Sequence, residues 1–374
     1  MTTLLCVGSG LARRYVINTL QALALPYGAR LQFRYTDSII APELIRPLER
    51  NALAGAKVLL GYVDCNESGR TATGRCGIIP YREAALLDSR RGGSIFTLRF
   101  EMRALRRSLG FDEFQASLPD ASPHWERNPD DTFKARGNSS PLSGWWCQEI
   151  GTEVLSQAPV PKEDTVATWQ GLVSELSKRS DFGQQPYFYM VEGLFRRKEG
   201  RPTNERVALE NGEYRLGSRV EYELSVIHFE PNFVPHAAGA TNPEPVLILD
   251  LPGPVLTARS SPLMVIDSPY DISVVHLATS EVNRLTYTSL YLHPKSDEPE
   301  LDIVPGLYFP ATIEGNFVRL IGNGLILGAL LTVTQLAAVF AKGTFPGSGY
   351  VATLIAVVGI GTGLFVSLGM RKPF

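Results

Sequence analysis

Residues 320–341 read LIGNGLILGALLTVTQLAAVFA, and residues 350–370 read YVATLIAVVGIGTGLFVSLGM. Neither run contains a charged side chain, and each has the roughly 20 residues that a helix needs to cross a bilayer core. Lipid offers no partner to an unpaired backbone group, so each run is predicted to form one spanning helix. The connection KGTFPGSG, 342–349, contains Pro346 and three glycines, which is typical of a tight turn. The sequence therefore predicts a C-terminal transmembrane hairpin within residues 311–374; the alternative is a pair of helices buried in a large core.

Basic side chains at the ends of the two runs predict the orientation of the hairpin. Arg319, Arg371 and Lys372 lie at the outer ends, whereas the turn contains only Lys342. Cytoplasmic segments carry the excess of Lys and Arg, so the preceding body and the C-terminus are expected in the cytoplasm. The first residues, MTTLLCVGSGLARR, have no basic n-region and do not predict a signal peptide. We expect a multi-pass protein with two spans in the inner (cytoplasmic) membrane.

Small and polar side chains within the hairpin indicate how it packs. Glycines spaced four apart let helix backbones approach closely in lipid, within one hairpin or between several copies. These glycines, with one more between the last pair, are Gly324, Gly328, Gly359, Gly361 and Gly363. Neither run contains an ionisable residue, so an ion path through a single copy is not expected. The polar side chains that several copies together could present to a pore are Asn323, Thr332, Thr334 and Gln335.

The formal net charge of −2 conceals an uneven distribution along the chain. Residues 1–110 contain 16 basic and 8 acidic side chains, residues 111–164 contain 4 and 10, and residues 165–310 contain 12 and 19. Residues 311–374 contain 4 and 1. We therefore expect a basic unit, an acidic and partly ordered linker, an acidic domain and a membrane tail at these boundaries. A hydrophobic content of 44% and a charged content of 20% exclude a mostly disordered chain, a coiled coil and a collagen-like repeat.

The basic unit is predicted to be a small mixed α/β structure. TLLCV resembles a buried strand, and LARRYVINTLQALAL after it has apolar residues at helical spacing. Alternation in RLQFRYT and in KVLLGYV predicts two further strands. The stretch 76–103 predicts two strands joined by a turn at 90–94, where Gly92 and Gly93 supply positive φ.

Two glycine motifs in this unit fall short of nucleotide-binding fingerprints. Gly8-Ser9-Gly10 lacks the third glycine of a dinucleotide fold, since Arg13 occupies that position. GRTATGRC, 69–76, has the spacing of a phosphate loop but replaces its lysine and its hydroxyl residue. Anion binding at the helix N-terminus beside Arg13 and Arg14 remains as a milder expectation.

Arginine dominates the charge of the basic unit: 15 of its 16 basic residues are Arg. Arginine binds phosphate and carboxylate through a planar two-pronged fork, whereas lysine offers a point charge. We therefore expect an electropositive surface for an acidic partner, with a solvated face of local ion pairs as the alternative. If the stretch 99–110 is helical, its arginines share one face. The predicted binding residues are Arg13, Arg14, Arg82, Arg90, Arg91, Arg99, Arg103, Arg106 and Arg107.

Turn formers and acids dominate the linker, whereas a helix and many short strands are predicted after it. Trp145 and Trp146 are exceptions in the linker, and they would dock onto a neighbouring domain or a partner. We also considered the acidic linker as an intramolecular clamp on the basic unit. Residues 165–178 have the spacing of an amphipathic helix, and strand patterns separated by Pro, Gly and Asp turns then favour an antiparallel sandwich or barrel. The predicted fold class is α+β, mostly β: a mixed α/β unit and a sandwich-like unit, followed by the hairpin.

The sequence predicts no catalytic residue, no cofactor and no metal ligand. Its four cysteines form no CxxC pair and are expected to be reduced, and its five histidines complete no recognisable zinc site. No G-x-S-x-G nucleophile elbow is present. Asp250, Asp267 and Asp271 lie near predicted strand ends, so a membrane-bound enzyme that uses these carboxylates stays an alternative.

The order of these parts resembles that of membrane effectors of bacterial immune and conflict systems. The resemblance is to effectors paired with cyclic-nucleotide signalling or with prokaryotic Argonaute proteins, and it rests on domain order. It implies that the basic region senses a nucleotide ligand, an acidic protein or a nucleic-acid-bound protein complex. The hairpins would then gather in a homo-oligomer and permeabilise the inner membrane, because one hairpin is too thin to enclose water. The alternative is a membrane-tethered scaffold whose hairpin only anchors a binding module.

Overall fold

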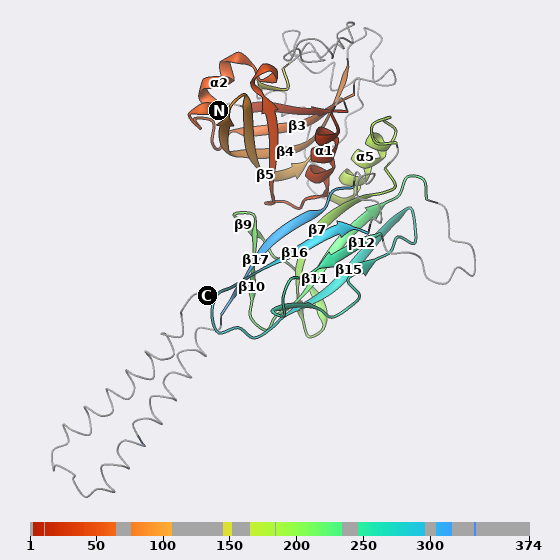
Figure 1. The fold of residues 1–374 in the computed structure, drawn as a ribbon. Helices are drawn as coiled ribbons and strands as arrows, with labels where there is room; N and C mark the ends of the chain where they lie inside the picture. Colours follow the sequence, from red (N-terminus) through yellow and green to blue (C-terminus); the bar gives the residue numbers. More distant parts are fainter. Residues whose placement is uncertain are drawn as a thin grey trace, which may run out of the picture.

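A computed structural model describes residues 3–10, 12–64, 76–106, 145–151, 165–183, 185–233, 246–295 and 304–315, together with residue 333. These residues form a mostly β structure with three sheets, which the helices α1, α2 and α5 accompany. An α/β domain at the N-terminus packs on a β-sandwich, as the ribbon in Figure 1 shows. The predicted mostly β fold class is confirmed for the described residues.

The N-terminal domain is built on one six-stranded sheet with the order β2-β5-β4-β3-β1-β6. β1 and β3 are parallel, whereas the other neighbours are antiparallel. Its elements are β1 (Thr3–Ser9), α1 (Arg13–Ala24), β2 (Arg30–Thr36), the 3-10 turn η1 (Asp37–Ile39), α2 (Pro42–Glu49), β3 (Lys57–Asp64), β4 (Gly77–Gly92), β5 (Ile95–Leu105) and β6 (Cys147–Ile150).

Buried and partly exposed side chains alternate along β5, which explains why this segment is a strand. A helix had been considered for residues 99–110. Leu98, Phe100 and Met102 are fully buried, while the residues between them are partly exposed. This period of two belongs to a pleated strand with one covered face. The helical alternative for 99–110 is therefore wrong for the part that β5 covers. Gly93 has φ of 65° in the predicted turn between β4 and β5, a conformation that favours glycine.

Part of the acidic linker belongs to the N-terminal sheet. β6 pairs antiparallel with β1, and the Val7 amide donates to the Trp146 carbonyl at 2.8 Å. The indole of Trp146 is buried and its centroid lies 4.8 Å from that of the Tyr15 ring. Trp146 therefore docks onto the neighbouring domain, as one alternative predicted, whereas Trp145 is 40% exposed. The clamp hypothesis concerns residues 111–144 and 152–164, which lie outside the described residues.

Cys6 and Cys147 face each other across the β1–β6 pair. Their Sγ atoms lie 3.6 Å apart, and both thiols are free and fully buried. Burial raises the pKa of the Cys6 thiol well above its ordinary value, and the hydrogen bond to Cys147 acts in the same direction. Cys76 is also a free, buried thiol, whereas Cys65 lies outside the described residues.

The second domain is a sandwich of two sheets. One sheet has the order β14-β12-β16-β17-β10-β9, and the other has the order β13-β15-β11-β7-β8. The strands are β7 (Phe188–Lys198), β8 (Arg201–Arg206), β9 (Leu209–Glu210), β10 (Glu213–Gly217), β11 (Glu221–Phe229), β12 (Leu247–Asp250), β13 (Leu256–Ala258), β14 (Leu263–Met264), β15 (Tyr270–Thr279), β16 (Thr286–Pro294) and β17 (Leu307–Glu314). Apart from β10 and β17, which are parallel, all described pairs in this domain are antiparallel.

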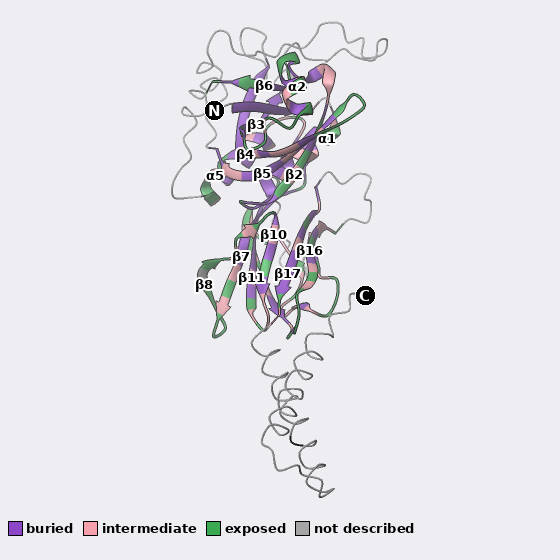
Figure 2. Ribbon diagram, turned by 90° about the vertical axis from the view of Figure 1, so that its left-hand side faces the viewer, coloured by how far each residue is buried: buried purple, intermediate pink, exposed green. Residues whose placement is uncertain are grey.

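Apolar alternation buries the inner faces of the two sheets. Leu224 and Val226 of β11 and Leu290 of β16 are almost fully buried. Figure 2 shows the same pattern as buried segments that run along the sandwich strands. His228 shares the β11 core face and is fully buried, and burial lowers its pKa to about 4, so the ring is neutral at pH 7. The sandwich, one of the two architectures predicted, is the one observed.

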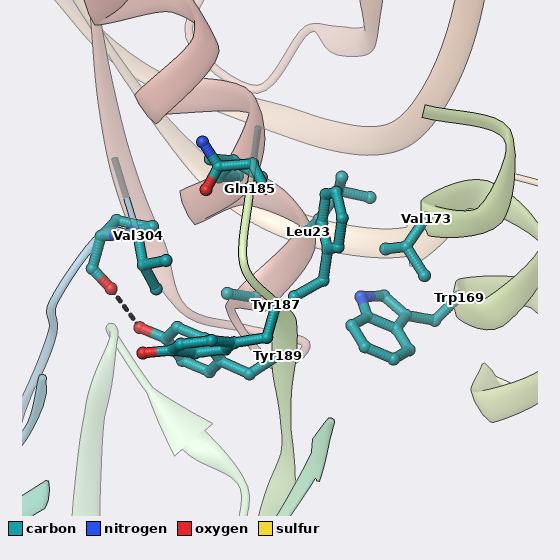
Figure 3. A pocket seen from close by; sticks show the side chains of 11 residues that line it. Leu23, Trp169, Val173, Gln185, Tyr187, Tyr189 and Val304 are labelled. Atoms are coloured by element: carbon teal, nitrogen blue, oxygen red, sulfur yellow. Dashed lines mark hydrogen bonds between the residues drawn. The ribbon is translucent and has the colours of Figure 1, made fainter. Parts of the chain in front are cut away.

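The helix α5 (Thr165–Ser177) and α1 join the two domains. α1 packs against β1 and β2 of its own sheet and also against β7, while α5 packs against β5 and β11. Figure 3 shows Leu23 of α1, Trp169 of α5 and Tyr187 converging on one small space. That space measures about 10 Å³, which holds one water at most, so this apolar junction is closely packed.

The predicted hairpin lies outside the described part of the chain. Both predicted spans, 320–341 and 350–370, fall there except for residue 333, and so do all the glycines and polar residues proposed to pack or to line a pore. Among the described residues, no helix has the length and apolar character needed to cross a membrane.

Replacing Trp146 with Ala is expected to destabilise the N-terminal domain. The change removes a buried indole against Tyr15, and such truncations cost about 3–5 kcal/mol. We expect the full chain in detergent to unfold several degrees lower in a thermal scan followed by circular dichroism.

Trp145→Ala is the matched control, because its side chain is adjacent in sequence and partly exposed. It should shift the midpoint by less than half as much. Equal shifts for the two variants would show that Trp146 does not anchor β6 to the sheet.

Candidate anion-binding pocket between the two domains

A polar cavity of about 240 Å³ lies where the two domains meet. The C-terminal end of α1, the strands β4 and β5, the first turn of α5 and the strands β7 and β8 surround it. We call it the arginine pocket. Its polar lining residues are Tyr27, Arg82, Arg103, Thr165, Thr168, Glu192 and Arg206.

Arg82 is the most constrained cation in the arginine pocket. The residue is 3% exposed, and its guanidinium donates to the carbonyls of Ala22, Leu25 and Arg103, the last two at 2.6 and 3.0 Å. These bonds fix its orientation but do not neutralise its charge. No carboxylate forms an ion pair with Arg82 within the part of the chain that the structure describes.

The electrostatic cost of this arrangement appears in the pKa of Arg82. Burial, together with the nearby charge of Arg206, lowers that pKa to about 9. A buried cation next to a second cation is expensive unless a negative group compensates it. An anion in the arginine pocket would supply that compensation.

Arg206 reaches the arginine pocket from the sandwich because Gly193 leaves room for it. A Cβ at Gly193 would lie 2.6 Å from Nε of Arg206, so any side chain there would displace the guanidinium group. Arg206 donates to the Glu192 carbonyl, and the Glu192 carboxylate accepts a 2.7 Å hydrogen bond from Ser225. Among the lining residues that the structure describes, Glu192 is the one carboxylate, against three arginines.

Arg103 and Tyr27 form the outer wall of the arginine pocket. The Arg103 guanidinium donates to the Tyr27 hydroxyl at 2.6 Å and lies 5.3 Å from the centre of its ring. Arg103 also pairs with Glu101 at 2.8 Å, so its charge is partly compensated already. Tyr27 is 52% exposed and presents an aromatic surface beside the cations.

The first turn of α5 adds partial positive charge and hydroxyl groups. Thr165 begins this helix, and Thr168 follows one turn later on the same wall. The N-terminal end of a helix carries partial positive charge, which favours an anion nearby. Combined with the three arginines, this wall suits a phosphate-bearing group, which arginine binds through two parallel hydrogen bonds.

The other arginines that were predicted to bind an acidic partner lie at separate places in the structure. Arg13 and Arg14 are exposed on α1, and Arg14 contacts Tyr15. Four more form ion pairs at the sheet: Arg90 and Arg99 with Asp88, Arg91 with Asp37 and Glu49, and Arg106 with Glu83. Arg107 lies outside the described residues. Among the predicted arginines that the structure describes, only Arg82 and Arg103 come together in one cavity.

Sequence reasoning missed Arg206 and the first turn of α5. Arg206 lies in the acidic second unit, so its charge was counted with a different domain. No pattern in the sequence indicated that Arg206 would lie in the same cavity as Arg82. The helix at 165–178 was predicted, although its partner across the domain boundary was not.

The carboxylates considered for catalysis do not converge. Asp271 accepts a hydrogen bond from the Asp267 amide within one turn, whereas Asp250 lies in the other sheet and bonds His293 at 3.0 Å. The second ring nitrogen of His293 lies 3.0 Å from the Pro294 carbonyl. Both ring nitrogens of His293 therefore have a hydrogen-bonding neighbour. The described residues contain no group of three metal-ligating side chains.

The chain matches no protein-family model, no curated protein and no solved structure.

Arg206→Gln is expected to weaken binding of inorganic pyrophosphate to the full chain. A hydrogen bond to a charged group contributes about 1.5–3 kcal/mol, so the dissociation constant should rise roughly 10- to 100-fold. Isothermal titration calorimetry in detergent measures it.

Arg196→Gln is the matched control on the same β7–β8 hairpin, because Arg196 is half exposed and 3.8 Å from Glu205. Its affinity for pyrophosphate should stay within about threefold of the wild type. An unchanged affinity in Arg206→Gln would show that pyrophosphate does not bind in the arginine pocket.

Proposed function

We propose that this chain is a membrane effector of a bacterial defence system, triggered by a phosphate-bearing ligand in the arginine pocket. The observation that carries the proposal is the buried guanidinium of Arg82, which faces Arg206 without a carboxylate partner among the described residues. Such a site is costly when empty and gains stability when an anion enters.

The size of the arginine pocket favours a small ligand over a large partner. A volume of about 240 Å³ accommodates the phosphates of a nucleotide, with Tyr27 beside them as a stacking surface. A nucleotide is therefore our first choice among the three partners that the sequence suggested. An acidic protein or a nucleic-acid-bound complex would have to insert a single phosphate or carboxylate.

Binding in the arginine pocket bridges the two domains. Arg82 and Arg103 belong to the N-terminal sheet, Arg206 belongs to the sandwich, and α5 contacts strands of both domains. A ligand that contacts both sides favours the domain arrangement in which these groups converge. The ligand's higher affinity for that domain arrangement would supply the free energy that shifts the protein towards it.

The output proposed for that switch is clustering of C-terminal hairpins. Soluble parts that associate raise the local concentration of the hairpins, which then pack through their glycines. The body and both chain ends would lie on the cytoplasmic side, and any pore would be oligomeric. Sequence pattern alone supports this part of the proposal.

Release of a trapped dye from proteoliposomes tests the function. The full chain is reconstituted around carboxyfluorescein, and inorganic pyrophosphate or a set of cyclic di- and trinucleotides is added. We expect at least one of these probes to release the dye from wild-type vesicles, and Arg206→Gln to reduce the rate at least tenfold.

A chimera with an unrelated two-span anchor in place of 311–374 separates an effector from a scaffold. The chimera should bind the active probe with wild-type affinity but release no dye. Dye release by the chimera, or no release by the wild type with a probe that binds, would overturn the pore-forming proposal and favour a tethered scaffold.

A further inference from the structure

One end of the sandwich gathers three connections that are distant in the chain. The Ser218 hydroxyl bonds the Ser280 carbonyl and the Val282 amide, which joins the β10–β11 turn to the segment before β16. β17 ends beside both, since Glu314 is the register partner of Gly217. Residues 283–285 and 287 are exposed at this end.

The chain leaves the sandwich at this end in a fixed position. A Cβ at Gly315 would lie 2.6 Å from the Arg284 amide nitrogen, so only glycine permits the close approach of the two backbones. The uncharged run begins at residue 320, five residues later. Five residues reach at most about 18 Å. If that run spans the bilayer, residues 284–287 must lie near the membrane surface.

The side chains exposed there suit the interfacial layer of a bilayer. Leu285 is 53% exposed and Tyr287 is 74% exposed, so two large side chains reach the surface at this end. Tyrosine is enriched at membrane interfaces, because its ring enters the apolar layer while its hydroxyl stays hydrated.

Two of the arginines at this end are paired with carboxylates. Arg219 pairs with Glu281, and Arg215 lies between Glu210 at 2.9 Å and Glu314 at 4.0 Å. These pairs weaken the attraction of this end to anionic headgroups, whereas the exposed side chains of Leu285 and Tyr287 suit apolar contact with the interfacial layer.

We propose that Leu285 and Tyr287, which we call the sandwich foot, insert into the interfacial layer of the bilayer and hold the sandwich end-on to the membrane. This inference rests on the proposed function, because it requires the hairpin to span. It goes further by assigning a lipid-binding surface to described residues and by fixing which end of the sandwich touches lipid. The membrane would then hold this end of the sandwich in place while a ligand changes the arrangement of the residues in the arginine pocket.

Tyr308 provides a matched position that should stay away from lipid. It is 63% exposed, and its register partner Tyr291 lies four residues from Tyr287 along β16. At about 3.3 Å per residue, this separation is about 13 Å along the strand. A sandwich that stands end-on lifts Tyr308 out of the interface.

Photo-crosslinking of the full chain in vesicles of phosphatidylcholine and phosphatidylglycerol tests the inference. Benzoylphenylalanine replaces Tyr287, Tyr308 or residue 333 in separate variants, and lipid adducts are quantified by mass spectrometry after illumination. We expect adducts at 287 and at 333, and at least tenfold less adduct at 308.

Four other crosslinking results would each contradict a specific part of this inference. Adducts at 333 but none at 287 would overturn the sandwich foot and leave the hairpin intact. Equal adducts at 287 and 308 would show that the sandwich lies flat, against the end-on arrangement. Absence of adducts at 333 would overturn the membrane hairpin and the inference with it. Yields at 287 that fall severalfold in 0.5 M salt would identify headgroup attraction instead of apolar insertion.

Discussion

The buried guanidinium of Arg82 is the constraint around which the junction of the two domains is organised. It links the end of α1 to β5 through three backbone carbonyls and approaches Arg206 from the opposite domain. Hydrogen bonds to a charged group stabilise the local structure, whereas burial of the charge opposes it. We propose that an anion in the arginine pocket offsets this cost.

The packing around that junction gives the site a rigid frame. α1 lies against its own sheet and β7, and Trp169 of α5 fills the space between them with almost no void. The apolar junction and the arginine pocket share α1 and α5. A ligand that draws the pocket walls together must therefore shift packed helices, which respond as units. From there the sandwich forms the direct connection to the C-terminal segment, through β17.

Periodicity was enough to predict most strands, and it failed where contacts between distant segments decide the structure. The alternation in VEYELSVIHF predicts β11 correctly, since one face of that strand is buried. β6 lies within an acidic, turn-rich segment, and only its pairing with β1 and the docking of Trp146 make it a strand. The arginine count predicted a basic unit, but it could not show that Asp88, Glu49 and Glu83 compensate much of that charge. Arg206 joined the site because Gly193 leaves room for it, a condition that a linear pattern does not express.

Hydrogen exchange of the full chain with and without inorganic pyrophosphate tests most directly whether an anion couples the two domains. The account predicts slower exchange on both sides of the arginine pocket, at residues 24–28, 165–170 and 201–206. It predicts no change at the remote β13 strand and loss of the protection in Arg206→Gln. Protection confined to one domain, or protection that persists in Arg206→Gln, would contradict it.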